Sequence, residues 1–184
     1  QLMSWLPLNT FPGNPDTGND CWGYVSPSGR EYALMGLSNG TAFVEVTDPG
    51  NAQLVQWISG PTSLWRDIKV YGDHAYAVSE GGSGIQVISL SQIDSGTVTQ
   101  VAQAGSGATH NVAIDTESGY LYRTGGSGNG LIIYSLANPS NPVEVGSWPD
   151  KYVHDMQVVT YQMGPYAGRQ IAFLCAGYNG GWNE

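Results

Sequence analysis

The sequence predicts an all-β chain, a β-propeller of four-stranded antiparallel blades with about three complete blades and two partial ones. Helical periodicity is nearly absent, and short runs rich in Val, Ile, Tyr and Ala alternate with Gly, Pro, Asn and Asp. This pattern is typical of strands joined by turns. Similar segments also recur, and their anchors Asp20, Asp67, Asn111 and Asp155 lie 47, 44 and 44 residues apart. That period fits a four-stranded propeller blade.

Each repeat holds the same series of elements. The first strand of each repeat is expected at 19–24, 66–71, 110–115 and 154–159. The second is expected at 31–36, 74–78, 119–123 and 171–175. Turns at 38–40, 81–84 and 125–130 follow, where Gly and Asn tolerate positive φ. Third strands are expected at 42–46, 85–88 and 131–134, and fourth strands at 54–58, 98–101 and 143–148.

The repeat divides the chain into one incomplete propeller domain, residues 1–184. Its parts are expected to be a last-blade outer strand with a linker at 1–18, blades at 19–65, 66–109 and 110–153, and a partial blade at 154–184. Residues 2–8 resemble a fourth strand in which Trp5 is placed like Trp57 and Trp148, which are expected to pack between blades. Because these pieces cannot close a ring, we expect a portion of a longer propeller or a chain paired with a second one.

Composition restricts the classes of partner. The 184 residues include 6 Lys+Arg and 15 Asp+Glu, and the formal net charge is −9. So few basic residues, without a cluster, argue against nucleic acid and anionic membrane surfaces. No apolar run is long enough to insert into a membrane. The acidic, Lys-poor and Gly/Ser/Asn-rich composition suits an extracellular environment, and the G-x-S-x-G, HExxH and P-loop motifs of enzymes are missing.

Two cysteines, Cys21 and Cys175, lie in expected strands. Two buried thiols are the first interpretation, and a single long-range disulfide is the alternative. Neither residue belongs to a ligand spacing that would hold structural zinc.

Several segments resemble one protein family. Residues 19–24 and 29–44, together with 65–71, 84–87, 154–159 and 166–173, look like the "choice-of-anchor B" propellers built from LVIVD-type repeats. The resemblance implies a secreted or surface-anchored propeller, commonly bacterial, without a settled shared catalytic activity, and usually longer than this chain. Two positions depart from the pattern: 90–94 replaces the usual Asp-Pro turn, and Asn111 replaces an Asp.

The starts of the first strands are the leading candidates for a binding site. In a propeller these strands border the central channel, so Arg66, His110 and His154 should converge with the anchors near one channel mouth. Asp20, Asp67 and Asp155, with Asn111, would offer the oxygen ligands that suit Ca²⁺. The histidines are alternatively bases or transition-metal ligands. A structural role is also open, in which each Asp accepts backbone N–H bonds and ties its blade to the neighbour.

Aromatic and modification sites complete the candidates. Trp22, Trp65 and Trp182, near blade starts or turns, are candidates for exposed contacts with a glycan or protein. Asn39 begins a formal glycosylation sequon, although a tight turn needs Asn-Gly equally well.

The expected function is therefore a secreted or cell-surface binding or scaffold module without enzymatic activity, stabilised by calcium. Its partner would be a protein or glycan at the cell surface. One alternative is an extracellular hydrolase or lyase that uses His and Asp at the channel mouth. The other is a structural subunit completed by a second chain through its open edges.

Overall fold

The computed structural model describes residues 1–126 and 130–177. Within them lie three four-stranded antiparallel sheets and one two-stranded sheet. The first sheet holds β1 (Gly18–Val25), β2 (Glu31–Leu37), β3 (Gly40–Glu45) and β4 (Gln53–Ser59). The second holds β5 (Arg66–Tyr71), β6 (His74–Ser79), β7 (Ile85–Ser89) and β8 (Thr99–Ala104).

The remaining strands continue the same order. The third sheet holds β9 (Asn111–Asp115), β10 (Tyr120–Thr124), β11 (Leu131–Ser135) and β12 (Val143–Trp148). The fourth sheet pairs β13 (Val153–Thr160) with β14 (Gln170–Ala176). Three short 3₁₀ helices occur at Leu8–Thr10, Ile93–Ser95 and Gly164–Tyr166. Among the residues described, no helix has the length and apolar character needed to cross a membrane.

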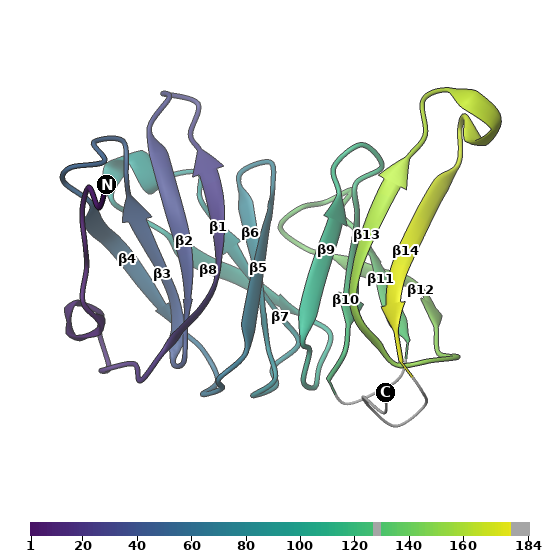
Figure 1. Ribbon diagram of the computed structural model, residues 1–184, viewed down its shortest axis with the longest axis horizontal. Helices are drawn as coiled ribbons and strands as arrows, with labels where there is room; N and C mark the ends of the chain where they lie inside the picture. Colours follow the sequence, from purple (N-terminus) through teal and green to yellow (C-terminus); the bar gives the residue numbers. More distant parts are fainter. Residues whose placement is uncertain (127–129, 178–184) are drawn as a thin grey trace.

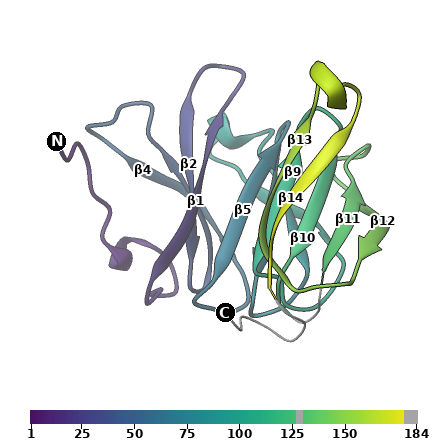
Figure 2. The same ribbon diagram turned by 45° about the vertical axis from the view of Figure 1, so that its right-hand side comes forward.

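The expected strands are confirmed with small shifts of their ends. Strands follow chain order within every four-stranded sheet, so β1, β5 and β9 each form one edge. These edge strands and β13 contact one another in succession, β1 with β5, β5 with β9 and β9 with β13. The sheets fan outward from this row (Figure 1, Figure 2).

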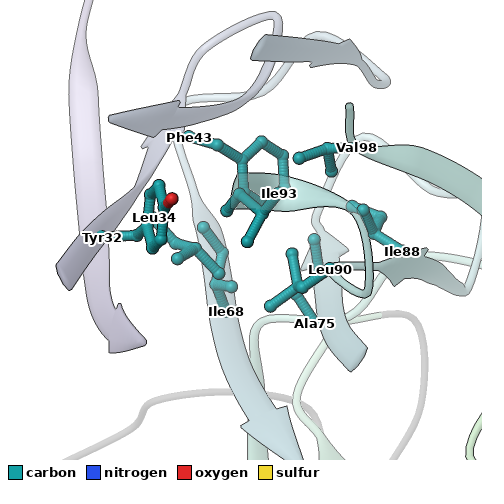
Figure 3. Close-up of a cluster of buried hydrophobic side chains, with 10 residues drawn as sticks. Tyr32, Leu34, Phe43, Ile68, Ala75, Ile88, Leu90, Ile93 and Val98 are labelled. Atoms are coloured by element: carbon teal, nitrogen blue, oxygen red, sulfur yellow. The ribbon is translucent and has the colours of Figure 1, made fainter. Parts of the chain in front are cut away.

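The hydrophobic core consists of separate layers between the sheets. Tyr32, Leu34 and Phe43 of the first sheet pack against Ile68 and Ile88 of the second (Figure 3). A second layer joins the second and third sheets, and a third layer joins the third sheet to β13–β14. Because each sheet buries apolar side chains on a neighbour, the repeat is stabilised by stacking as well as by strand pairing.

Glycines directly precede the third strands β7 and β11, where backbones approach closely. Gly84 has φ +63°, and a Cβ there would lie 2.4 Å from the Ala104 carbonyl oxygen. Gly130 has φ +82°, and its Cβ would overlap the Trp148 carbonyl. The hairpin glycines are therefore required by both conformation and space.

The atypical connection at 90–94 has a defined structure. It contains the 3₁₀ helix Ile93–Ser95, and Leu90 and Ile93 are buried in the first core layer. The Tyr32 hydroxyl donates to Asp94 Oδ1 at 2.7 Å. This connection thus ties the outer parts of the first two sheets together.

The prediction that both thiols are buried is wrong. Cys21 and Cys175 are exposed and free. Cys21 pairs with Met35, on the face of the first sheet that points away from the second. Cys175 pairs with Asp155, on the face of β13–β14 that points away from the third sheet. A side chain on a sheet face is buried only where another sheet packs on that face. In the described chain no sheet packs on the faces that carry Cys21 and Cys175.

The N-terminal segment differs from the expectation as well. Residues 1–7 form no strand, and Trp5 is 73% exposed instead of packed between sheets. Leu6 and Phe11 pack on the outer half of the first sheet, near Leu37 and Val44. Trp148 is half-buried in the core layer between the third sheet and β13–β14, as predicted. Trp57 is half-buried too, but it packs in the cluster that the N-terminal segment forms with the first sheet, and not between two sheets. Pairing of residues 2–8 with a last blade remains a prediction.

Candidate functional site

The sequence-predicted channel-mouth residues come together. They line two adjoining hollows over β1, β5, β9 and β13. One, of about 390 Å³, is lined by Asn19, Asp20, Trp65, Arg66, His110, Asn111, His154 and Asp155. The other, of about 360 Å³, shares Asp20, Asn111 and Asp155 and adds Trp22, Asp67, Lys69, Thr116 and Gln157 among its lining residues. We call the second hollow the inner cavity.

The first two anchors tie each edge strand to the next one. The Ile68 N–H donates to Asp20 Oδ2 at 3.1 Å, from β5 to β1. The Val112 N–H donates to Asp67 Oδ2 at 2.8 Å, from β9 to β5. Edge strands of different sheets share no ladder, so these carboxylates satisfy backbone donors that strand pairing leaves open. The structural role proposed for the anchor carboxylates is thus confirmed for Asp20 and Asp67.

The third anchor continues the series with a different hydrogen bond. The Asn111 side-chain amide donates to the His154 carbonyl oxygen at 2.8 Å. An Asp could not donate there, which explains the departure from Asp at this repeat. Asp155 Oδ1 accepts a hydrogen bond from the N–H of the next residue, Met156, at 2.7 Å. Its side chain is exposed at the end of the described series.

Asp67 is the most perturbed carboxyl of the site. Burial raises its pKa to about 7, and a hydrogen bond with Asp20 adds to the rise. Lys69 Nζ, which lies 2.5 Å from Asp67 Oδ1, opposes this shift. The Ile68 N–H also donates to Oδ1, at 2.8 Å. Burial next to the Asp20 carboxyl therefore keeps the Asp67 carboxyl protonated to a higher pH than an ordinary Asp.

Arg66 does not present its charge to the site, contrary to the expectation. Its side chain is 1% exposed and enters the seam between the first two sheets. Nε donates to the Leu37 carbonyl at 3.0 Å, and Nη2 donates to the Pro61 carbonyl at 2.7 Å. Burial lowers its pKa to about 10. The guanidinium thus serves as a buried donor for backbone carbonyls.

Arg123 plays the same role between the second and third sheets. It was not among the residues predicted from the sequence. Its guanidinium is buried, and it donates to Thr109 Oγ1 and to the Ser106 carbonyl at 2.8 and 2.9 Å. It lies on β10, whereas Arg66 begins β5. Arg66 and Arg123 occupy different positions in the repeat. Only the scarcity of Arg in the chain would therefore have pointed to Arg123 as a candidate.

The rings of the two histidines and Trp65 form one aromatic group. The rings of His110 and His154 lie 4.2 Å apart between centroids, and Trp65 meets His110 edge-on at 5.7 Å. His110 Nδ1 lies 2.6 Å from Glu80 Oε1. Burial, followed by the charge of His110, lowers the pKa of His154. The lowered pKa favours the neutral form of the His154 imidazole.

The aromatic candidates Trp22 and Trp65 lie at different hollows. Trp22 is 42% exposed at the inner cavity, with Lys69 Nζ 4.5 Å from its ring centroid. Trp65, 43% exposed, lines the other hollow. Trp182 lies outside the described residues. Asn39 is part of the β2–β3 turn, and its amide donates to the Pro12 carbonyl at 3.1 Å, so the turn role expected as the alternative is present.

The metal candidates only partly suit calcium. Asp67 already accepts from two backbone N–H groups and Lys69, whereas Asp20, Asn111 and Asp155 bring further oxygens to the same cavity. Across residues 1–126 and 130–177, no three His, Cys, Asp or Glu side chains are grouped as a metal ion would require. Calcium takes six to eight oxygens, so backbone or water oxygens would have to supply the rest.

Comparison with known proteins supports the fold. No family model and no curated protein matches the sequence. A crystal structure of a protein from Lactobacillus plantarum, a structural genomics target, superposes with a TM-score of 0.56 at 14% identity. The match covers 91% of this chain and 57% of that protein. This chain therefore spans little more than half the length of that structural neighbour, and the likeness concerns the fold alone.

Proposed function

We propose that the chain forms part of an extracellular β-propeller that binds a polar ligand of the glycan type in the inner cavity without transforming it. The observation that carries the proposal is the convergence of four edge strands on this cavity. Its volume of about 360 Å³ lies in the range of small-molecule sites. Carboxylates, amides and the exposed Trp22 indole provide hydrogen bonds and a stacking face for a sugar.

The propeller arrangement is supported by the stacking of the sheets. Successive sheets repeat the same order, contact through β1, β5, β9 and β13, and are joined by core layers. The resemblance to LVIVD-type repeats and the acidic, Lys-poor composition support a secreted or surface-anchored protein. The ring would include more sheets than the described residues provide.

Glycan-array binding tests the ligand proposal. We expect the chain to bind a subset of glycans, and Trp22→Ala or Gln157→Leu to weaken binding at least tenfold. Trp5→Ala and Gln103→Leu are matched controls, because both side chains are exposed away from the cavity. Absence of glycan binding, or equal loss in the control variants, would refute the proposal.

Calcium stabilisation is a separate part of the proposal. Asp20, Asn111 and Asp155 supply oxygen ligands at the inner cavity. Calcium chloride should therefore raise the thermal midpoint of the chain, and Asp155→Asn should reduce that rise. An unchanged midpoint in CaCl2 would remove calcium from the proposal.

A second candidate function is an extracellular hydrolase or lyase, favoured by the contact of Glu80, His110 and His154. A carboxylate that holds one imidazole nitrogen is the arrangement by which general bases are oriented. Replacing both histidines by Ala separates the candidates. Loss of turnover on a glycan substrate with binding retained would favour the enzyme, whereas retained binding with no turnover in either protein favours the binding module.

A third candidate is a structural subunit completed by another chain. The observation behind it is that the outer face of β13–β14 has no sheet upon it in the described chain.

A further inference from the structure

The stack of sheets has two different ends. On β13–β14, Met156, Val158 and Leu174 pack against the third sheet. The alternate residues therefore point the other way. We call these Asp155, Gln157, Val159, Phe173 and Cys175 the leading face. The trailing face belongs to the first sheet and includes Cys21, Gly23, Val25, Ala33 and Val46, which line an open hollow.

The internal seams show how a leading face meets a trailing face. At each of the first two seams, an anchor Asp accepts a hydrogen bond from the residue that follows the next anchor. Asp20 accepts from Ile68, and Asp67 accepts from Val112. In this register Asp155 is the next acceptor, and Cys21, which follows Asp20, is the equivalent donor. One chain thus carries both the acceptor and the donor for one more contact between sheets of this kind.

The side chains of the two ends are also complementary. Phe173 is 52% exposed on the leading face, beside the exposed Val159. The trailing hollow is lined mainly by apolar residues, and the N-terminal segment covers the outer half of that sheet while leaving Cys21 and Val25 exposed. Exposed Trp5 and Leu2 add apolar surface on the segment that lies on this side. Such surfaces are typical of an interface.

We propose that a second copy of this chain docks head to tail, so that Asp155 of one copy accepts the Cys21 N–H of the next. The inference names the partner of the structural-subunit candidate and rests on the stacking of sheets, not on the ligand cavity. The contact is heterologous, since different faces of the two copies meet, and it forms rings or open chains of copies.

The two thiols give the contact a chemical signature. Val78 pairs with Asp67, and Val78 and Val112 share one core layer across the second seam. Cys175 pairs with Asp155 as Val78 pairs with Asp67. Cys175 of one copy and Cys21 of the next would therefore occupy the places of Val78 and Val112.

Crosslinking of a mixture tests this arrangement. The Cys21→Ser and Cys175→Ser variants each keep one thiol. Diamide accepts two electrons and two protons from a pair of thiols, which become a disulfide. We expect covalent dimers when the two variants are mixed and at least tenfold fewer with either variant alone. Dimers of one variant alone, in equal yield, would show a like-to-like contact and overturn the proposal.

Reversible association gives an independent readout. Analytical ultracentrifugation should show concentration-dependent self-association of the reduced chain, and Phe173→Glu should weaken it at least tenfold. Met163→Glu is the control, because Met163 is an exposed apolar residue that lies in the β13–β14 connection and not on the leading face. A strictly monomeric chain, or equal weakening by both variants, would overturn the proposal. Glycan binding by such a monomer would still support the cavity, so the two failures are distinguishable.

Discussion

Asp67 Oδ2 accepts a hydrogen bond from the Val112 N–H at 2.8 Å, across the seam between the second and third sheets. The equivalent bond from Ile68 to Asp20 spans the preceding seam. These bonds connect edge strands that share no ladder, and they lie at the wall of the inner cavity. The carboxylates of Asp20 and Asp67 thus hold neighbouring sheets in register.

The Asp67 carboxyl should make stability depend on pH. Its pKa in the folded chain is about 7, above the ordinary value of an unfolded Asp, so the folded chain holds a proton that the unfolded chain releases. Its contribution is fully present below about pH 4 and is lost as pH rises through 7. The free energy of unfolding should fall by at most roughly 1.4 kcal/mol per pH unit over that window.

Urea unfolding of Asp67→Asn between pH 4 and 8 checks this prediction. The variant should lose the fall in stability that the native chain shows. Asp150→Asn, an exposed control, should keep it. Equal slopes for all three proteins would contradict the assignment.

Replacing Arg66 should destabilise the seam between the first two sheets. Arg66→Met leaves the Leu37 and Pro61 carbonyls without their buried donor. We expect a loss of about 3 kcal/mol in the free energy of unfolding. Arg169→Met should change it by less than about 0.5 kcal/mol, because that side chain is exposed. Similar values for both variants would show that the buried guanidinium contributes little.

The histidine contact should be visible in titrations of His154. Burial is the main cause of its lowered pKa, and the charge of His110 is the next. His110→Gln should therefore raise the pKa of His154 part of the way to its ordinary value, as followed by the NMR shift of its Hε1 proton. Glu80→Gln removes a charge that raises this pKa and should move it the other way. Shifts of the same sign in both variants would contradict the contact.

The hairpin glycines allow crowding to be separated from backbone strain. Gly84 and Gly72 both have positive φ, but only Gly84 lies against a neighbouring backbone. Thermal unfolding should show Gly84→Ala to be more destabilising than Gly72→Ala by at least about 1 kcal/mol. Equal losses of stability in the two variants would mean that the backbone near Ala104 moves away from the added Cβ at no cost in free energy.

Strand positions and the convergence of the anchors could be predicted from the sequence because both follow from the repeat. The directions of individual side chains could not. Cys21 and Asp155 each follow an irregular pairing, between Gly18 and Cys21 and between Val153 and Asp155. A shift of one residue exchanges the two faces of a strand. Burial of Arg66 likewise depends on carbonyls from distant turns, which no local pattern reveals.

Backbone NMR during titration with an array-selected glycan tests the ligand cavity most directly. If the inner cavity is the binding site, the largest amide shift changes will fall on Trp22, Asn111 and Gln157. The β13–β14 connection at 161–169 should be unaffected. Largest changes in that connection, or on the trailing face at Val25 and Val46, would place the ligand elsewhere and contradict the proposed function.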